Sequence, residues 1–123
     1  MSGLKVRGIR GATTADANTA EAIEAAVAEL LATIQAENGF RLEDVAGVIF
    51  TATPDLNAAF PAAAARRLGW DRVPLLCAQE MAVPDALPLC VRVLVLINTS
   101  LGQEEVRHVY LKGARQLRPD LAG

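Results

Sequence analysis

Histidine and cysteine are scarce in this chain of 123 residues: His108 is the single histidine, and Cys77 and Cys90 are the two cysteines. No HxxxH, CxxC or acidic cluster is present, so the usual ligand sets of a catalytic metal are missing. The two cysteines are not spaced as in a zinc site or a redox pair. We therefore expect no metal, and reduced thiols in a cytoplasmic protein.

Long hydrophobic runs and phosphate-binding loops are also missing. Residues 87–97 are apolar, but this run is too short to span a bilayer and contains Arg92. We see no signal peptide. The glycines around Arg10 lack the spacing of the glycine-rich phosphate motifs, so we expect no nucleotide cofactor. A net charge of −2 gives no support for binding to nucleic acid or to a membrane surface.

The composition is globular, with 52% hydrophobic and 21% charged residues, and the length suits a single domain over 1–123. Hydrophobic periodicity predicts seven elements in the order β-α-β-α-β-β-β. The predicted strands are 4–9, 48–53, a segment within 70–77, 89–98 and 106–111, and the predicted helices are 18–38 and 58–68. This order favours an α+β fold, with a mixed sheet of about five strands and two main helices.

The ends of the first helix have recognisable signals. Asn18, with Glu21 three residues later, is a plausible N-terminal cap, and Gly39 supplies a stop. Two helices cannot cover both faces of a five-stranded sheet, so we expect another subunit to close one face of a homo-oligomer. The tail over 114–123 is expected to be mobile.

Arg92 is the most informative residue, because it interrupts an apolar strand-like run. A buried, unpaired guanidinium is costly, so we expect Arg92 to have an anionic partner such as a ligand. The structural alternatives are an edge-strand arginine that faces solvent and an ion pair with Glu80. Glu80 could act as a general base, as an acceptor for a substrate hydroxyl, or only as the partner of Arg92. Cys77 could be a nucleophile, but no local motif ties His108 to it as a base, which favours a packing or hydrogen-bonding thiol.

Each of the other candidate residues has a structural interpretation beside its functional one. Arg10, between two glycines, either contacts a ligand or is simply solvated at a strand end. Tyr110 binds a ligand or packs in a core or interface, and His108 is expected to be a satisfied sheet residue. Phe60 precedes the proline that opens the helix, and it either lines a pocket or packs against the helix as a hydrophobic staple. Arg66 shares that helix with another arginine, and at least one of the two should be solvated.

Seven short segments together resemble one family along nearly the whole chain, from about residue 4 to 121. The segments read RGIRGATT from 7, ATPDL from 52, FPA from 60, CAQEM from 77, CVRV from 90, RHVYL from 107 and LRPDL from 117. In this order they resemble the small trimeric α/β class of chorismate mutase, which is unrelated to the all-helical mutases. Each segment is weak alone, and the ordered set is what makes the resemblance specific.

The resemblance implies a homotrimer that packs as a pseudo-α/β barrel, with three active sites at subunit interfaces. It implies conversion of chorismate to prephenate, on the branch toward phenylalanine and tyrosine. This pericyclic rearrangement of one substrate uses no nucleophile, metal or cofactor. The rival hypothesis is a trimeric small-metabolite-binding protein, similar to the enamine-deaminase-like proteins, without mutase activity.

The resemblance also implies residue roles by position. Arg92 would donate to the breaking ether oxygen, Arg10 would bind a carboxylate, and Tyr110 would donate near the ether bridge. Glu80, with the backbone or thiol of Cys77, would hold the ring hydroxyl. The other substrate-binding residues implied are Phe60 and Leu117 as pocket walls, Arg66 and Arg118 as steering cations, and Leu76. Leu76 and Ala63 stand where the family often has Thr and Lys, which puts a ring contact and a rim cation in doubt.

Overall fold

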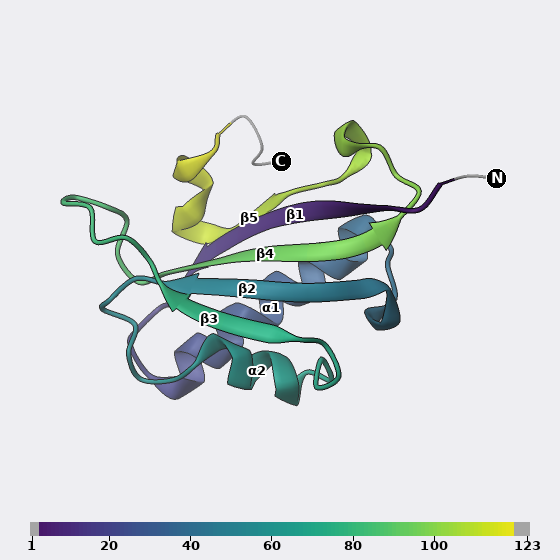
Figure 1. Cartoon of the computed structure of the whole chain (residues 1–123). Coiled ribbons are helices and arrows are strands. Elements are labelled where there is room, and N and C mark those ends of the chain that lie inside the picture. Colours follow the sequence, from purple (N-terminus) through teal and green to yellow (C-terminus); the bar gives the residue numbers. More distant parts are fainter. Residues whose placement is uncertain (1–2, 120–123) are drawn as a thin grey trace.

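The computed structural model describes residues 3–119 as one mixed sheet with helices. Five strands follow the order β3-β2-β4-β1-β5 across the sheet, as Figure 1 shows. The elements are β1 (Lys5–Thr14), α1 (Ala20–Asn38), η1 (Leu42–Asp44), β2 (Val45–Ala52), α2 (Pro61–Arg67), β3 (Leu75–Gln79), β4 (Cys90–Thr99), η2 (Gln103–Glu105), β5 (Val109–Tyr110) and η3 (Lys112–Leu117). The predicted α+β fold with a five-stranded mixed sheet and two main helices is confirmed.

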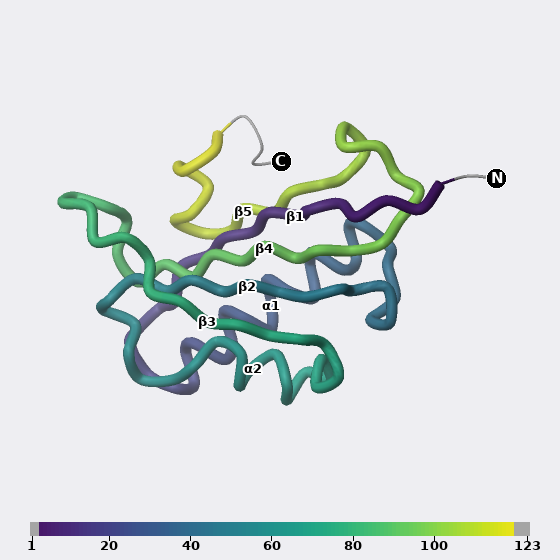
Figure 2. The backbone as a smooth tube through the Cα atoms, viewed as in Figure 1, coloured from purple at the N-terminus to yellow at the C-terminus, as the bar shows by residue number. Residues whose placement is uncertain are grey.

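The centre of the sheet is the antiparallel pair of β1 and β4, which match residue for residue from Lys5 with Thr99 to Thr14 with Cys90. Strand β2 pairs antiparallel with the other edge of β4, while β3 and β5 add parallel edges to β2 and β1. The backbone trace in Figure 2 shows the connection from β3 to β4 extending beyond the end of the sheet. Glu80 lies at the start of this connection, directly after β3, and Arg92 follows it in β4.

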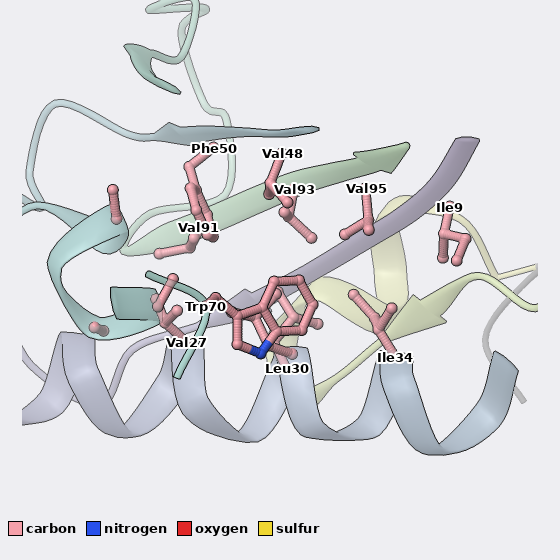
Figure 3. Close-up of a cluster of buried hydrophobic side chains, with 14 of the residues drawn as sticks. Ile9, Val27, Leu30, Ile34, Val48, Phe50, Trp70, Val91, Val93 and Val95 are labelled. Atoms are coloured by element: carbon pink, nitrogen blue, oxygen red, sulfur yellow. The ribbon is translucent and has the colours of Figure 1, made fainter. Parts of the chain in front are cut away.

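The core lies between one face of the sheet and the two helices. Apolar residues of α1 recur at helical spacing, and those of the strands recur at every second position. Figure 3 shows the side chains of Ile9, Val48, Phe50, Val93 and Val95 directed toward α1, with Trp70 among them. Each of these residues is at most 4% exposed. Both helices therefore cover the same face, as their mutual contact requires.

Gly11 allows α1 to approach β1 closely. A Cβ at this position would lie 2.6 Å from Cδ1 of Ile34 and 3.0 Å from Cγ1 of Val93, which is a severe overlap. Gly11 therefore meets a packing requirement, and β1 runs on to Thr14 rather than ending at residue 9.

Side chains at helix α1 explain two further differences from the predicted boundaries. Thr19, not Asn18, caps α1, because its Oγ1 accepts from the N–H of Ala22 at 3.1 Å. Asn18 instead accepts from the backbone N–H groups of Asn57 and Ala58, and so fixes the segment before α2.

The last strand is shorter than predicted, and only Val109 and Tyr110 pair with β1. Asn38 explains this, since its side chain donates to the carbonyl of Arg107 and accepts from the N–H of Arg107. The backbone of Arg107 is thereby satisfied outside the sheet.

Within residues 3–119, neither α1 nor α2 covers the second face of the sheet, and we call this face the uncovered face. The short helix η3 packs there at one end, where Ala114 is fully buried against Ala12 and Tyr110. Of residues 112–117, Ala114 is buried and Leu117 packs against the same cluster. The mobility expected for residues 114–123 stays a prediction, and residues 120–123 lie outside the described part. None of the helices within residues 3–119 is long and apolar enough to cross a membrane.

Candidate active site

On the uncovered face, a row of paired residues crosses the sheet from β3 to β5, perpendicular to the strands. Cα pairing places Ala78 beside Thr51, Thr51 beside Arg92, Arg92 beside Ala12, and Ala12 beside Tyr110. Paired residues of neighbouring strands point to the same side of a sheet. The polar side chains of Thr51, Arg92 and Tyr110 therefore share this face. Neighbouring strands lie about 4.8 Å apart, and β1 lies between β4 and β5, so the Cα atoms of Arg92 and Tyr110 are about 10 Å apart. A small organic anion can bridge this distance.

Arg92 and Glu80 form an ion pair on this face. Nε of Arg92 lies 3.3 Å from Oε1 of Glu80, and the hydroxyl of Thr51 donates to the same oxygen at 2.6 Å. Glu80 follows β3 directly, and its N–H donates to the carbonyl of Ala52 at 2.9 Å. The sheet thus fixes both charged groups. The contact with Glu80 uses one of the five N–H donors of the guanidinium, so four others point elsewhere.

The structure agrees with the predicted anionic partner of Arg92 but not with the predicted burial of its side chain. An anionic partner exists, as expected, but the side chain of Arg92 is 46% exposed and that of Glu80 is 22% exposed. The run around Arg92 is apolar because its odd positions face the core, while Arg92 itself faces outward. The guanidinium is therefore exposed in a single chain, and no burial cost forces the ion pair to form.

Arg10 lies on the same face, two residues before Ala12 in β1 and beside Leu94 of β4. Its N–H donates to Nδ1 of His108 at 2.9 Å. Burial is the main cause that lowers the pKa of His108, followed by the positive charges of Arg10 and Arg118. Arg10 thus sits in a cationic region that suits an anionic ligand.

Tyr110 marks the other end of the site. It is 8% exposed and belongs to a small apolar cluster with Ala12 and Ala114, on which Leu117 also packs. The charge of Arg118, one residue further, acts on His108. Segment 110–118 therefore brings a phenol, an apolar side chain and a guanidinium to the same end of the uncovered face.

Three predicted residues, Phe60, Cys77 and Arg66, lie apart from this group. Cys77 pairs with Phe50 of the buried face and packs against the main core, so its side chain points away from Arg92. Cys77 and Phe60 line a pocket of about 460 Å³ at the carboxyl ends of β2 and β3, and Phe60 is 72% exposed. Arg66 is exposed in the last turn of α2. Within one chain, the thiol of Cys77 and the carboxylate of Glu80 are on opposite faces.

The two departures from the family pattern fall on different sides of the chain. Leu76 pairs with Ile49 on the uncovered face and is 61% exposed. Ala63 is half-buried in α2, on the side of the sheet where Phe60 and Cys77 line their pocket. The missing Thr and Lys therefore affect separate regions.

Sequence reasoning missed the residues that support Arg92. The hydroxyl of Thr53 accepts from the N–H of Cys90 at 3.0 Å and donates to Oδ1 of Asp55 at 2.5 Å. Asp55 also accepts from the N–H of Leu89, which has a left-handed φ of 52°. This network fixes the start of β4, two residues before Arg92. A threonine and an aspartate directly after an apolar strand, Thr53 and Asp55, were the available signal.

The cysteine nearest the ion pair is Cys90, which is 2% exposed. Burial raises the pKa of its thiol, and Arg92 opposes this shift only in part. The thiol is therefore protonated near pH 7, and this form is a poor nucleophile. In the part of the chain that the structure describes, no three His, Cys, Asp or Glu residues are placed to hold a metal ion.

An arginine–carboxylate pair, a second arginine and a tyrosine share one face of an α+β sheet, and together they form a candidate anion-binding site. The chain belongs to the family described as chorismate mutase type I, whose model matches residues 6–121. It is 56% identical over 117 residues to "Chorismate mutase AroH" of Thermus thermophilus, covering 94% of this chain and 96% of that protein. It is 47% identical over 120 residues to the protein of the same name from Bacillus subtilis, covering 97% and 94%.

The fold agrees with this membership. A solved chorismate mutase from Clostridium thermocellum superimposes with a TM-score of 0.87 at 45% sequence identity. The match covers 89% of this chain and 97% of that structure. Sequence and fold therefore identify the same family independently of the site geometry.

Proposed function

We propose that the chain is a chorismate mutase, an isomerase that rearranges chorismate to prephenate in the synthesis of phenylalanine and tyrosine. The observation that carries this function is the match to the mutase family over almost the whole chain. The cationic face with Arg92, Arg10 and Tyr110 suits a substrate with two carboxylates. The rearrangement proceeds within one molecule, so binding and electrostatics are the only contributions required of the protein.

Arg92 is the proposed catalytic centre. Negative charge grows on the ether oxygen of chorismate as its C–O bond breaks, and a fixed guanidinium beside that oxygen stabilises the transition state more than the ground state. The Nε contact with Glu80 and the bond from Thr51 to Glu80 hold the guanidinium in place before substrate arrives. Preorganisation of this kind means that little reorientation is needed during the reaction.

The second contribution is conformational. Chorismate reacts only when its enolpyruvyl arm folds over the ring, and holding that conformer lowers the entropic part of the barrier. Arg10 is proposed to bind a carboxylate, Tyr110 to donate near the ether bridge, and Glu80 to accept from the ring hydroxyl. Leu117 packs on the cluster of Tyr110, and the charge of Arg118 acts on His108, so both are proposed to close one side of the bound substrate.

We further propose a homotrimer with active sites between subunits. The uncovered face carries exposed apolar side chains, with Val6 56%, Ile49 38% and Leu76 61% exposed, and an apolar patch of this kind indicates association. In addition, Phe60, Arg66 and Cys77 lie away from Arg92 in one chain. A neighbouring subunit that contributes these three residues to the Arg92 face would complete the site. The number of subunits comes from the family resemblance.

The remaining proposals follow from the same hypothesis. Residues 1–123 would act as one mutase domain, since a single sheet runs through the described part. The two cysteines are both free, which is typical of proteins in a reducing cytoplasm.

The deciding experiment measures the loss of chorismate absorbance with micromolar protein and no additives, beside Arg92→Ala. Rapid loss with the wild type and none with the variant would support both the reaction and its central residue. Equal loss in both would keep the reaction and remove Arg92 from its centre. No loss in either would favour the rival metabolite-binding protein. Light scattering during gel filtration tests the trimer, which requires a mass of three times 13.0 kDa.

A further inference from the structure

The single histidine completes the edge of the sheet beside Arg10. The N–H of Arg10 donates to Nδ1 of His108 at 2.9 Å, whereas the pairing of β1 with β5 begins only at Gly11 and Val109. In a longer β5, a backbone carbonyl would accept from the N–H of Arg10. Here the imidazole of His108 accepts instead, one residue before the pairing of β1 with β5 begins. It ties the backbone at Arg10 to the segment that leads into Tyr110.

Cations surround this imidazole. A hollow of about 500 Å³ is lined by His108, Arg7 and Arg10, with uncharged residues of β1, β4 and segment 103–106. Nε of Arg7 donates to the carbonyl of Leu101, and the positive charge of Arg118 also reaches the ring. No carboxylate belongs to the described residues that line the hollow. Protonation of His108 would add a further positive charge to this cluster.

The hydrogen bond sets the required form of the ring. Nδ1 can accept only when the imidazole is neutral and carries its proton on Nε2. In the protonated ring, Nδ1–H would face the N–H of Arg10, so the bond would be replaced by two opposed donors. The pKa of His108, lowered by burial and by Arg10 and Arg118, keeps the ring neutral at pH 7.

We propose that His108 is a positioning residue for Arg10, and that its neutral form alone holds the β1 backbone where the Arg10 guanidinium binds a substrate carboxylate. This inference rests on the proposed role of Arg10 in carboxylate binding. His108 acts through Arg10 and not on the breaking bond. Its loss should therefore raise KM for chorismate more than it lowers kcat.

The first test compares three variants at pH 8. His108→Ala removes the acceptor, and we expect KM to rise about 3- to 10-fold, the effect of one lost hydrogen bond, with kcat nearly unchanged. His108→Asn carries an amide oxygen near the position of Nδ1 and cannot titrate, so it should restore most of the wild-type KM. Arg107→Ala alters the exposed neighbour, whose backbone is held by Asn38, and should leave KM unchanged.

The second test links the effect to protonation. Because the chain has one histidine, ¹⁵N-histidine labelling gives a single ring to follow by NMR. We expect the Nε2–H tautomer at pH 8, and a fall in kcat/KM below pH 6.5 that follows the NMR titration. Carboxylates titrate near pH 4, below this range. His108→Asn should lack the fall.

The outcomes separate this inference from the proposed function. A wild-type ring protonated on Nδ1 at pH 8, or equal KM values for His108→Ala and the wild type, would overturn the positioning role. An acid loss that persists in His108→Asn would overturn the pH dependence. If Arg10→Ala leaves KM unchanged, the carboxylate role of Arg10 fails instead, whatever His108 does.

Discussion

The two faces of the sheet differ in what covers them, and strand β4 alone shows the difference. Val91, Val93 and Val95 are at most 4% exposed beneath the helices. Arg92 and Leu94 alternate with them and point to the face without a helical layer. A single strand thus supplies the core on one side and, in our proposal, the catalytic and association surfaces on the other.

In this proposal, alternate positions of the same segment encode stability and activity. Burial of the valines contributes to folding of the chain itself, since each buried CH₂ is worth about 0.8 kcal/mol. The guanidinium of Arg92, half exposed and paired on the surface, contributes little to folding. Substitutions at adjacent positions should therefore have opposite consequences.

We expect the largest effect when alanine replaces Arg92 or its neighbour Val93, because one change should lower turnover and the other should lower stability. Arg92→Ala should lower kcat about 10³-fold, because it removes the charge partner of the transition state, and should change the unfolding free energy by less than about 1 kcal/mol. Val93→Ala should cost about 2 kcal/mol of stability and keep kcat while folded. Steady-state kinetics and denaturant unfolding of both variants measure the contrast.

Two outcomes would break this contrast: an Arg92→Ala protein that loses stability as Val93→Ala does, or a Val93→Ala protein that loses turnover while folded. Arg92→Lys refines the test. A single ammonium cannot pair with Glu80 and also reach the substrate as a guanidinium does, so turnover should remain low.

The next effect concerns association through the uncovered face. Leu94→Glu places a charge between Ile49 and Arg10 at the centre of the proposed subunit interface. We expect elution near the monomer mass of 13.0 kDa and loss of most mutase activity, since the site would lack the residues of its neighbour. Gel filtration with light scattering and the chorismate assay measure both.

Ala25→Glu is the matched control, because it adds the same charge on the exposed side of α1. It should leave mass and activity unchanged. A fully active Leu94→Glu monomer would contradict an active site shared between subunits.

Sequence reasoning recovered the fold because its elements are local and strongly patterned. Helix α1 repeats apolar residues over five turns, and β4 alternates over ten residues, so tertiary contacts reinforce the local pattern. The errors occur where a side chain competes with the backbone. Asn38 takes the hydrogen bonds of Arg107, and Thr19 takes the cap assigned to Asn18. Such choices depend on neighbours distant in sequence.

The site was predictable only in part for a similar reason. An arginine inside an apolar strand pointed to Arg92 and Glu80 directly. The side on which Cys77 faces depends on the register between β3 and β2, which no local pattern reveals. The role of Thr51 depends on the same register. The exposure of Arg92 could not be predicted from hydropathy, because Leu94 and Leu96 make its own side of the strand apolar as well.

A smaller effect compares two glycines of β1 that face opposite sides. Gly11→Ala would place a Cβ 2.6 Å from Ile34, so we expect a loss of about 1–3 kcal/mol in unfolding free energy from overpacking. A Cβ at Gly8 would lie 3.2 Å from Cδ1 of Leu94 and 3.7 Å from Cδ2 of Leu96, which are flexible side-chain ends on the uncovered face, so Gly8→Ala should cost less. Denaturant unfolding of both variants checks the order. Equal losses would mean that the two faces constrain β1 alike.

The smallest effect is the pH dependence of stability that His108 contributes. Its pKa in the folded chain is lowered from 6.5, chiefly by burial and then by Arg10 and Arg118. Above pH 6.5 the ring is neutral in both states, so this contribution is fully present. As the pH falls below 6.5 the unfolded chain binds the proton first, and the unfolding free energy decreases until the folded pKa has been passed. Urea unfolding between pH 8 and 5 measures this loss, and the same series on His108→Asn should lack it. If both proteins lose the same stability over this range, acid sensitivity comes from other groups, and the hydrogen bond from Arg10 to His108 does not distinguish the two protonation states.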